Sequence, residues 1–224
     1  MDTLMERFSE NLLFGGLPQA TLKQLADKAI TKTYTSQEII VYQEDVWPYL
    51  FFVDQGNIHA TKESPEGRVF IATTLKPEDI FWGLAFFIEK APMPVMLQAK
   101  SDAVIYRWSR DFLVPMIKGN EVMSWNLCQI MIKRMQLASE IVEDLAFQPI
   151  MGRLAGLLLD LSGDVDSEFI ARELTLEEMA ARIGTTRYMV CRHFYRFAEK
   201  GVIQINRTEL KIKDRELLLK QARK

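Results

Sequence analysis

The stretch Leu174–Phe194, LTLEEMAARIGTTRYMVCRHF, decides the fold of the C-terminal part of the chain. Thr175 followed by two glutamates is typical of a helix start, because a hydroxyl caps the first amides and acids favour the positive end of the helix dipole. Gly184 supplies the positive φ that ends this helix, and either of the next two threonines can cap a second one. Two short helices joined by a tight glycine turn, with the small Ala180 at their crossing, predict a helix-turn-helix.

Two short runs of alternating apolar and polar residues follow the second helix. Gly201 ends that helix, Val202–Ile205 and Leu210–Lys213 alternate as strands should, and Asn206–Arg207 forms a turn between them. A hairpin directly after the second helix makes the motif a winged helix-turn-helix. Because such proteins place the second helix in the major groove, the sequence predicts binding to double-stranded DNA.

The side chains expected to meet DNA divide by role. Arg187, Tyr188 and Arg192 lie on the outer face of the second helix near its start, where this motif reads base edges. Arg187 is the candidate for a bidentate contact to guanine O6 and N7. Contacts to the DNA backbone, which set the register, are expected from Thr175, Thr186, Lys200 and Arg207. An ordinary helical hairpin with solvated side chains is the alternative.

The charges divide unevenly along the chain. Residues 171–224 hold 13 Lys and Arg against 7 Asp and Glu, which leaves 15 basic and 23 acidic residues of the chain's 28 and 30 for the rest. A basic C-terminal part on an acidic body is expected when one domain meets phosphate and the other does not.

Composition excludes several classes of protein. With 224 residues, 48% of them hydrophobic, the chain can bury two modest cores. No apolar run approaches the length of a membrane span and no N-terminal segment resembles a cleaved signal, so we expect a cytoplasmic protein with no membrane contact. Cys128 and Cys191 are too few for a disulfide framework and lack metal-binding spacing, and we expect no cofactor.

The first 118 residues indicate an antiparallel β-roll. A helix that opens at Leu17–Pro18 is expected to end near Lys32, and from Thr33 the period of the apolar residues changes to two. Strands are expected at 39–42, 49–53, 57–61, 69–73, 96–99 and 103–108. Many short strands at regular spacing are typical of a barrel or roll.

The longest helical pattern runs from Glu121 to about Phe147 and is closed by Pro149. One stripe of it advances in alternating steps of three and four residues, which is an a/d seam. This stripe consists of Cys128, Met131, Met135, Ala138, Val142 and Leu145. An adjoining face can pack on the roll and consists of Leu127, Ile130, Leu137 and Ile141. Because one roll cannot cover both, we expect the seam to pair with the same helix of a second copy in a two-fold homodimer; packing on the neighbouring domain is the alternative.

We therefore expect an α+β chain of three parts: a β-roll sensor domain at 1–118, a dimerisation helix at 119–148 and a winged helix-turn-helix domain at 149–224. This order resembles the CRP/FNR family of bacterial transcription regulators, most specifically over residues 174–212. In the roll, Phe52–Ile58 and Asp79–Gly83 look like the family's strand-and-turn and glycine segments. The resemblance implies a cupin-like roll of the cyclic-nucleotide-binding type, a homodimer on a palindromic operator, and RNA polymerase as a partner.

The chain departs from the family where a cyclic nucleotide would bind. In members that bind one, the glycine of that segment is followed by glutamate, and an Arg-Ser pair downstream holds the cyclic phosphate. Here Gly83 is followed by Leu84, and the matching downstream positions are Met93 and Pro94. A cyclic phosphate buried there would lack its charge partner, so we do not expect cyclic AMP as effector. The iron–sulfur branch needs an N-terminal cysteine cluster, and residues 1–100 contain no cysteine.

Large apolar side chains are found in the segment where relatives that bind a cyclic nucleotide have their phosphate-binding residues. We expect a small apolar effector in a pocket lined by Phe81, Trp82, Leu84, Phe86, Met93 and Met96. If these side chains are only the core of the roll, the regulator is independent of a ligand; a redox response through Cys128 is a further alternative. Haem is disfavoured because His59 lies in a strand and His193 within the second helix of the motif.

Two classes of protein other than a regulator stay open. One is an enzyme with an appended winged helix, and the other is an interaction module whose basic end binds an acidic protein. The first 150 residues hold one histidine and one cysteine, which argues against a catalytic or metal cluster, so we expect neither an enzyme nor a metal site. Tyr188 occupies the position at which related proteins often have an acidic residue that contacts a base. A half-site sequence deduced from a glutamate at this position therefore does not apply to this chain.

Overall fold

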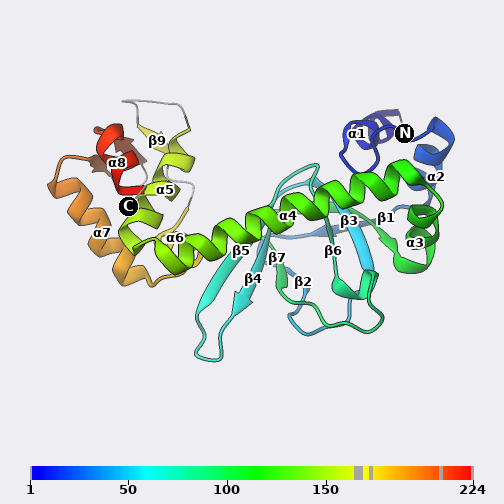
Figure 1. The fold of residues 1–224 in the computed structure, drawn as a ribbon, viewed down its shortest axis with the longest axis horizontal. Coiled ribbons are helices and arrows are strands. Elements are labelled where there is room, and N and C mark those ends of the chain that lie inside the picture. Colours follow the sequence, from blue (N-terminus) through cyan, green and yellow to red (C-terminus); the bar gives the residue numbers. More distant parts are fainter. Residues whose placement is uncertain (1, 164–168, 172–173, 207–208, 223–224) are drawn as a thin grey trace. The chain divides into compact units, whose positions relative to one another are not determined.

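The computed structural model describes residues 2–163, 169–171, 174–206 and 209–222. The chain forms two compact units (Figure 1), one made of Met1–Lys62 and Ile71–Gln136, and the other of Glu63–Phe70 and Leu137–Lys224. The fold is α+β, and every strand pairing whose register is described is antiparallel.

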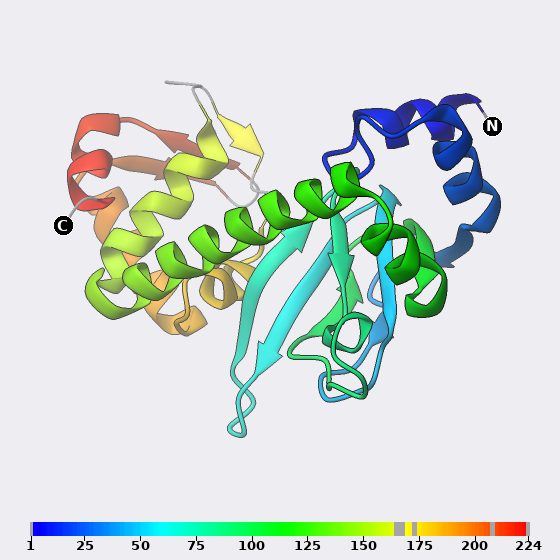
Figure 2. The same ribbon diagram turned by 45° about the vertical axis from the view of Figure 1, so that its right-hand side comes forward.

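The first unit is a roll of two four-stranded sheets (Figure 2), in the orders β1-β8-β3-β6 and β2-β7-β4-β5. The strands are β1 (Ile30–Tyr34), β2 (Ile39–Val41), β3 (Tyr49–Gln55), β4 (Ile58–Glu63), β5 (Val69–Leu75), β6 (Ile80–Trp82), β7 (Met96–Ala99) and β8 (Ala103–Ser109). Phe51 of one sheet and Leu97 of the other are fully buried in one apolar cluster. The two inner faces therefore share a core, as expected for sheets that alternate apolar and polar residues.

Two helices, α1 (Asp2–Glu10) and α2 (Gln19–Lys28), add a second cluster to this unit. Phe8 is fully buried, with its ring 5.3 to 5.5 Å from those of Phe14, Phe52 and Trp108. Arg7 pairs with Asp54, so a charge contact accompanies the burial. Helix α1 and the segment after it are thus an integral part of the first unit's core.

The expected end of α2 near Lys32 is wrong. The helix ends at Lys28, and β1 follows, with Ile30 opposite Arg107 and Tyr34 opposite Ala103 of β8. The hydrogen bonds to β8 are non-local, so local periodicity does not reveal them.

Beyond β6 come a short 3₁₀ turn, η1 (Leu84–Phe86), then α3 (Arg110–Lys118) and the long α4 (Glu121–Phe147). In the first part of α4, Met123, Leu127 and Ile130 are buried in the same cluster as Phe8. Figure 2 shows this part of α4 running across the roll. The roll therefore covers one face of the helix.

The second unit contains α5 (Ile150–Ser162), β9 (Ile170–Ala171), α6 (Leu176–Arg182), α7 (Arg187–Glu199), β10 (Ile203–Ile205), β11 (Glu209–Ile212) and α8 (Arg215–Ala222). The strands form a three-stranded sheet in the order β10-β11-β9. Leu154 of α5, Phe194 of α7 and Leu218 of α8 share one buried core. Helix α8 has no counterpart among the elements expected from the sequence.

Candidate nucleic-acid interface

The helix-turn-helix predicted from the sequence is confirmed as α6, a glycine turn and α7. The hydroxyl of Thr175 accepts from the Glu178 amide at 3.1 Å, and the Glu178 carboxylate accepts from the Thr175 amide at 2.8 Å, so both orphan donors are satisfied. Gly184 has φ +64° in the turn. The hydroxyl of Thr186 then caps α7 by accepting from the Met189 amide at 3.4 Å. Both side-chain caps expected in this motif are therefore made.

Helix α7 divides sharply into a buried and an exposed face. Its inner side chains are Val190, His193, Phe194 and Phe197, all buried. On the outer face Arg187, Tyr188 and Arg192 are exposed, as expected for residues that read bases, and Tyr188 has 71% of its surface accessible. The outer face is therefore free to enter a groove.

The exposed face of α7 extends beyond Arg187, Tyr188 and Arg192. An open depression of about 460 Å³ lies along α7, lined by Tyr188, Cys191, Arg192, Tyr195, Arg196 and Glu199. Tyr195 and Arg196 were not among the expected DNA contacts, although they lie one helical turn beyond Cys191 and Arg192. Helical spacing from Arg192 is the sequence signal that would have identified them.

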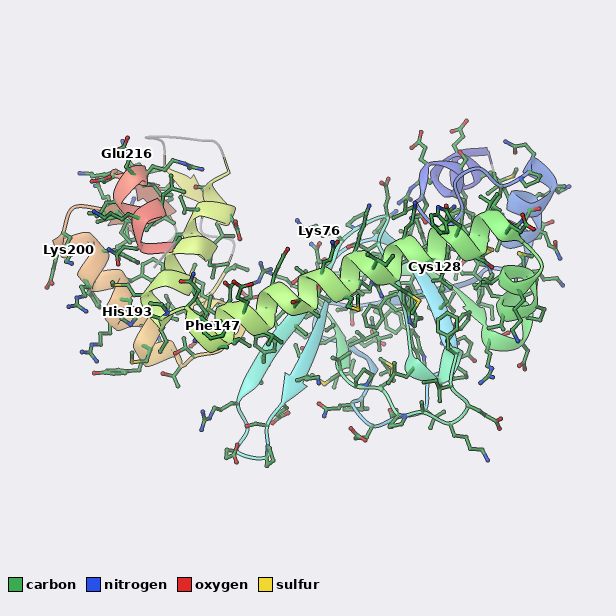
Figure 3. The ribbon with its side chains drawn as sticks, viewed as in Figure 1. Lys76, Cys128, Phe147, His193, Lys200 and Glu216 are labelled. Carbon is green, nitrogen blue, oxygen red and sulfur yellow. The ribbon has the colours of Figure 1, made fainter. Side chains whose placement is uncertain are left out.

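The remaining expected contacts precede or follow α7 in the chain, and Thr175 and Thr186 are exposed at the caps described above. Lys200 is exposed directly after α7 (Figure 3). The wing is formed by β10 and β11, with Ile203 opposite Ile212 and Ile205 opposite Leu210. Arg207 lies outside the described residues.

His193 lies on the buried face of α7. Its Nδ1 is buried without a hydrogen bond in the described structure. Burial lowers the pKa of His193, and the neighbouring charges of Arg192 and Arg196 lower it further, so the neutral imidazole is favoured. Figure 3 shows the residue on α7.

The six residues of the expected seam on α4 are all exposed in the single chain. The exposed fraction is 50% for Met131, 69% for Met135 and 64% for Val142. Cys128, labelled in Figure 3, is exposed and carries a free thiol. Of the adjoining face, Leu127 and Ile130 are buried, whereas Leu137 is 47% exposed. The long helix therefore presents an uncovered apolar stripe.

The residues expected to line an effector pocket fall into two different apolar clusters. Phe86 is buried with Phe8 and Trp108, with Trp82 packed against them. Met93 is buried in the other cluster, against which Phe81 packs. Met96 is half-buried in β7 and Leu84 is 39% exposed, so these six side chains do not converge on one point.

Met93 closes the space above Gly83. A Cβ on Gly83 would overlap the carbonyl oxygen of Trp47 and meet the Met93 sulfur at 2.9 Å. Met93 is itself fully buried. The position at which the family resemblance places part of the phosphate site is therefore filled by an apolar side chain.

Arg134 of α4 covers the two aromatic residues of β6. Its guanidinium carbon lies 4.2 Å from the ring centroid of Trp82 and 5.0 Å from that of Phe81, and its Nη2 donates to the carbonyl oxygen of Ile80. Burial lowers the pKa of Arg134 to about 10, although Asp79 nearby favours the charged form. The chain's own cation therefore occupies the aromatic face proposed for an effector.

No group of three or more His, Cys, Asp or Glu in the described ranges is arranged to hold a metal ion. Within the same ranges, no helix is both long enough and apolar enough to span a bilayer.

Taken together, the geometry is that of a winged helix-turn-helix protein with an antiparallel roll. Comparison with known protein families supports both parts: residues 152–221 match the Crp-like helix-turn-helix domain, and residues 31–120 match the cyclic nucleotide-binding domain. The chain belongs to the CRP/FNR family of transcription regulators.

Individual relatives agree in sequence and in fold. The chain is 23% identical, over all of both chains, to the CRP-like cAMP-activated global transcriptional regulator of Mycobacterium tuberculosis. It is 25% identical to the cAMP-activated regulator Vfr of Pseudomonas aeruginosa, covering 78% of this chain and 85% of Vfr. A protein of Eubacterium rectale assigned to the CRP/FNR family has the same fold, with a TM-score of 0.77 at 20% identity over 95% of this chain and 98% of that one. A CooA mutant from Carboxydothermus hydrogenoformans has a TM-score of 0.73 at 20% identity, covering 89% and 90%.

Proposed function

We propose that the protein is a homodimeric regulator that binds a palindromic DNA operator and acts with RNA polymerase in the cytoplasm. The observation that carries this proposal is the outer face of α7, where Arg187, Tyr188 and Arg192 are exposed above a capped helix-turn-helix. Two copies of α7 related by a two-fold axis enter successive major grooves about one helical turn apart.

The dimer is supported by the uncovered stripe on α4. Its members recur in steps of three and four residues, the spacing at which two helices pack knobs into holes. In a single chain these apolar side chains are exposed to water, which costs about 25 cal/mol for each Å² of apolar surface compared with burial. Pairing with a second copy of α4 removes that cost.

The test of this function is selection of bound sequences from a random duplex library by the purified protein without added ligand. We expect a palindromic consensus, because the dimer carries two identical reading helices. Retention of duplexes without sequence enrichment, and with a strong dependence on salt, would overturn sequence-specific recognition by the protein in this state.

The names of several relatives include activation by cAMP, but Met93 and Leu84 favour a different control of this chain. We infer a small apolar effector in the roll, on the basis of its aromatic residues. A second candidate, a regulator that needs no ligand, is favoured by Arg134 on Phe81 and Trp82 and by the closure of Gly83.

A thermal-shift screen separates these two candidates. A panel of apolar and aromatic compounds, with cAMP included, should raise the unfolding temperature if one binds the folded roll. No shift with any compound, together with a consensus in the ligand-free selection, supports the ligand-independent candidate. Stabilisation by cAMP alone would overturn our exclusion of that nucleotide.

A further inference from the structure

Arg153 joins the ends of two helices that belong to different functional parts. It lies near the start of α5, just after Pro149. Its Nε donates to the carbonyl oxygen of Ile183, the C-cap of α6, at 2.8 Å, and its Nη1 donates to that of Gln148, directly after α4, at 2.9 Å. Two longer contacts from Nη1 reach the carbonyls of Asp144 and Leu145, at 3.3 and 3.4 Å. One guanidinium thus bridges α4 and the helix-turn-helix.

Two of these acceptors, the carbonyls of Gln148 and Ile183, lie at helix ends, whereas that of Asp144 also accepts from the Gln148 amide at 3.0 Å. The last carbonyls of a helix have no partner within the helix, and a cation there is favoured by the helix dipole. A planar guanidinium presents several donors in a fixed fork, so it can bond two helix ends at once, whereas an ammonium is a compact point charge. Burial lowers the pKa of Arg153 and Asp144 offsets part of this, but the guanidinium stays charged.

The joint lies outside the buried apolar core of the second unit. The buried core of the second unit draws its described side chains from α5 to α8 and the strands, and none of them comes from α4. A cavity of about 200 Å³ lies beside the joint, lined by polar side chains such as Asp144 and Arg182 and by apolar ones such as Ile141, Leu145 and Leu157. The side chain of Leu145 makes a local contact with the turn, since a Cβ on Gly184 would lie 2.7 Å from its Cδ2. The direction of α6 and α7 relative to the end of α4 therefore depends on the bridge together with these local apolar contacts.

We propose that Arg153 is a positioning residue that sets the spacing between the two operator half-sites that the dimer accepts. This inference rests on the proposed function, because spacing has meaning only for a dimer on a palindrome. Each added base pair moves a half-site by 3.4 Å and turns it by about a tenth of a helical turn. With the guanidinium in place, the helix-turn-helix cannot easily shift or rotate to match a half-site at another spacing. Without the guanidinium, it can adjust to the new position.

The test is a set of palindromic duplexes built from the selected consensus, with the half-sites at the preferred spacing and at one or two base pairs more or fewer. We expect the wild-type protein to favour one spacing by about tenfold or more, equivalent to about 1.4 kcal/mol. Arg153→Ala should reduce this preference to less than about threefold, while affinity for a single half-site stays within about twofold of wild type. A purely structural role would lower affinity equally at every spacing.

Arg215→Ala is the matched control. Arg215 also bonds near a helix end, donating to the hydroxyl of Ser162 at 3.1 Å and to the carbonyl of Gly163 at 2.6 Å, but these groups are at the far end of α5. Its spacing profile should equal that of the wild-type protein. Arg153→Lys keeps the charge without the fork, so a flattened profile is expected there too, and it carries the test if the alanine variant does not fold.

An unchanged spacing profile in a folded Arg153 variant, or an equal loss at all spacings, would overturn the proposal. Failure of the proposed function has a different signature: the wild-type protein itself would then select no palindrome.

Discussion

Glu177 holds Arg187 across the helix-turn-helix, with its Oε1 2.9 Å from the Nε of Arg187 and both side chains 64% exposed. The contact uses Nε and leaves the two terminal NH₂ groups available. These two groups can donate a bidentate pair of hydrogen bonds to guanine O6 and N7. Glu177 also supplies an acid beside the start of α7, whose own first turn contains none. The pair is weak in water, but it restricts the direction of the guanidinium.

We predict that Glu177→Ala lowers discrimination at the base pair read by Arg187 by about three- to tenfold, because the guanidinium is then free to turn. Glu177→Gln should keep part of it, since its amide oxygen can still accept from Nε. Competitive titration with the consensus and a duplex substituted at that base pair measures the ratio. Glu216→Gln, which removes an exposed acid on α8, is the control. Tighter binding to both duplexes would mean that Glu177 competes with DNA for Arg187.

Loss of Arg187 itself should affect one base pair of each half-site. We expect Arg187→Ala to weaken binding to the cognate site by about 1–3 kcal/mol and to relax specificity at that position. Lys200→Ala should instead weaken binding to all sequences and reduce the salt dependence by about one unit of slope. Equal losses for Arg187→Ala on cognate and random DNA would show that Arg187 contacts only phosphate.

The helix-turn-helix could be predicted from the sequence because its signals are local. Thr175, Glu178, Gly184 and Thr186 lie next to the groups that they cap or turn, and the helix expected over 121–147 matches α4. Residues that break helices lie at both ends of that pattern, so the bounds of the helix can be predicted.

The parts that sequence reasoning missed depend on partners far along the chain. Strand β1 is stabilised by β8, about 70 residues later, and α8 by its packing on α5. On sequence grounds Arg134 and Arg153 are ordinary helical cations. Their roles follow from the carbonyls and rings that the fold brings to them, and periodicity contains no information about those partners.

Gly83 offers a direct test of the closed phosphate position. We predict that Gly83→Ala destabilises the protein by about 1–3 kcal/mol, because the new Cβ overlaps the Trp47 carbonyl and presses on the Met93 sulfur. Gly156→Ala is the control: nothing lies within 4 Å of a Cβ there, and it is inside α5, so a gain of about 0.5–1 kcal/mol is expected. Chemical denaturation measures both. A Gly83→Ala protein as stable as wild type would contradict the packing described around this residue.

His193 should make the stability of the second unit depend on pH. Its pKa in the folded protein is lowered by burial and by Arg192 and Arg196, whereas in the unfolded chain it is about 6.5. As the pH falls below about 6.5, the unfolded chain takes up the proton first, so stability is present above this pH and is lost toward the lower pKa of the folded state. We expect the fall in unfolding free energy between pH 7.5 and 5.5 to be smaller in His193→Gln than in the wild type. Equal pH dependence in the two proteins would contradict the assignment to His193.

The stripe on α4 leads to a prediction about assembly. Met135 lies in the middle of the stripe and is 69% exposed in the single chain. In a two-fold seam, Met135→Glu places one carboxylate from each copy in the apolar contact. Burying a carboxylate without a partner is costly. We expect the dimer dissociation constant, measured by sedimentation equilibrium, to rise by about a hundredfold or more, equivalent to about 3 kcal/mol.

Gln136→Glu is the control for that change, because the adjacent residue is exposed but lies off the 3–4 spacing of the stripe. It adds the same charge to the same helix and should leave the dimer intact. The two variants should also differ on DNA: Met135→Glu should bind a palindrome no more tightly than a single half-site, because linkage of the two reading helices provides the gain in affinity. If both variants remain dimers, the seam lies elsewhere, and the stripe then packs against another part of the same chain.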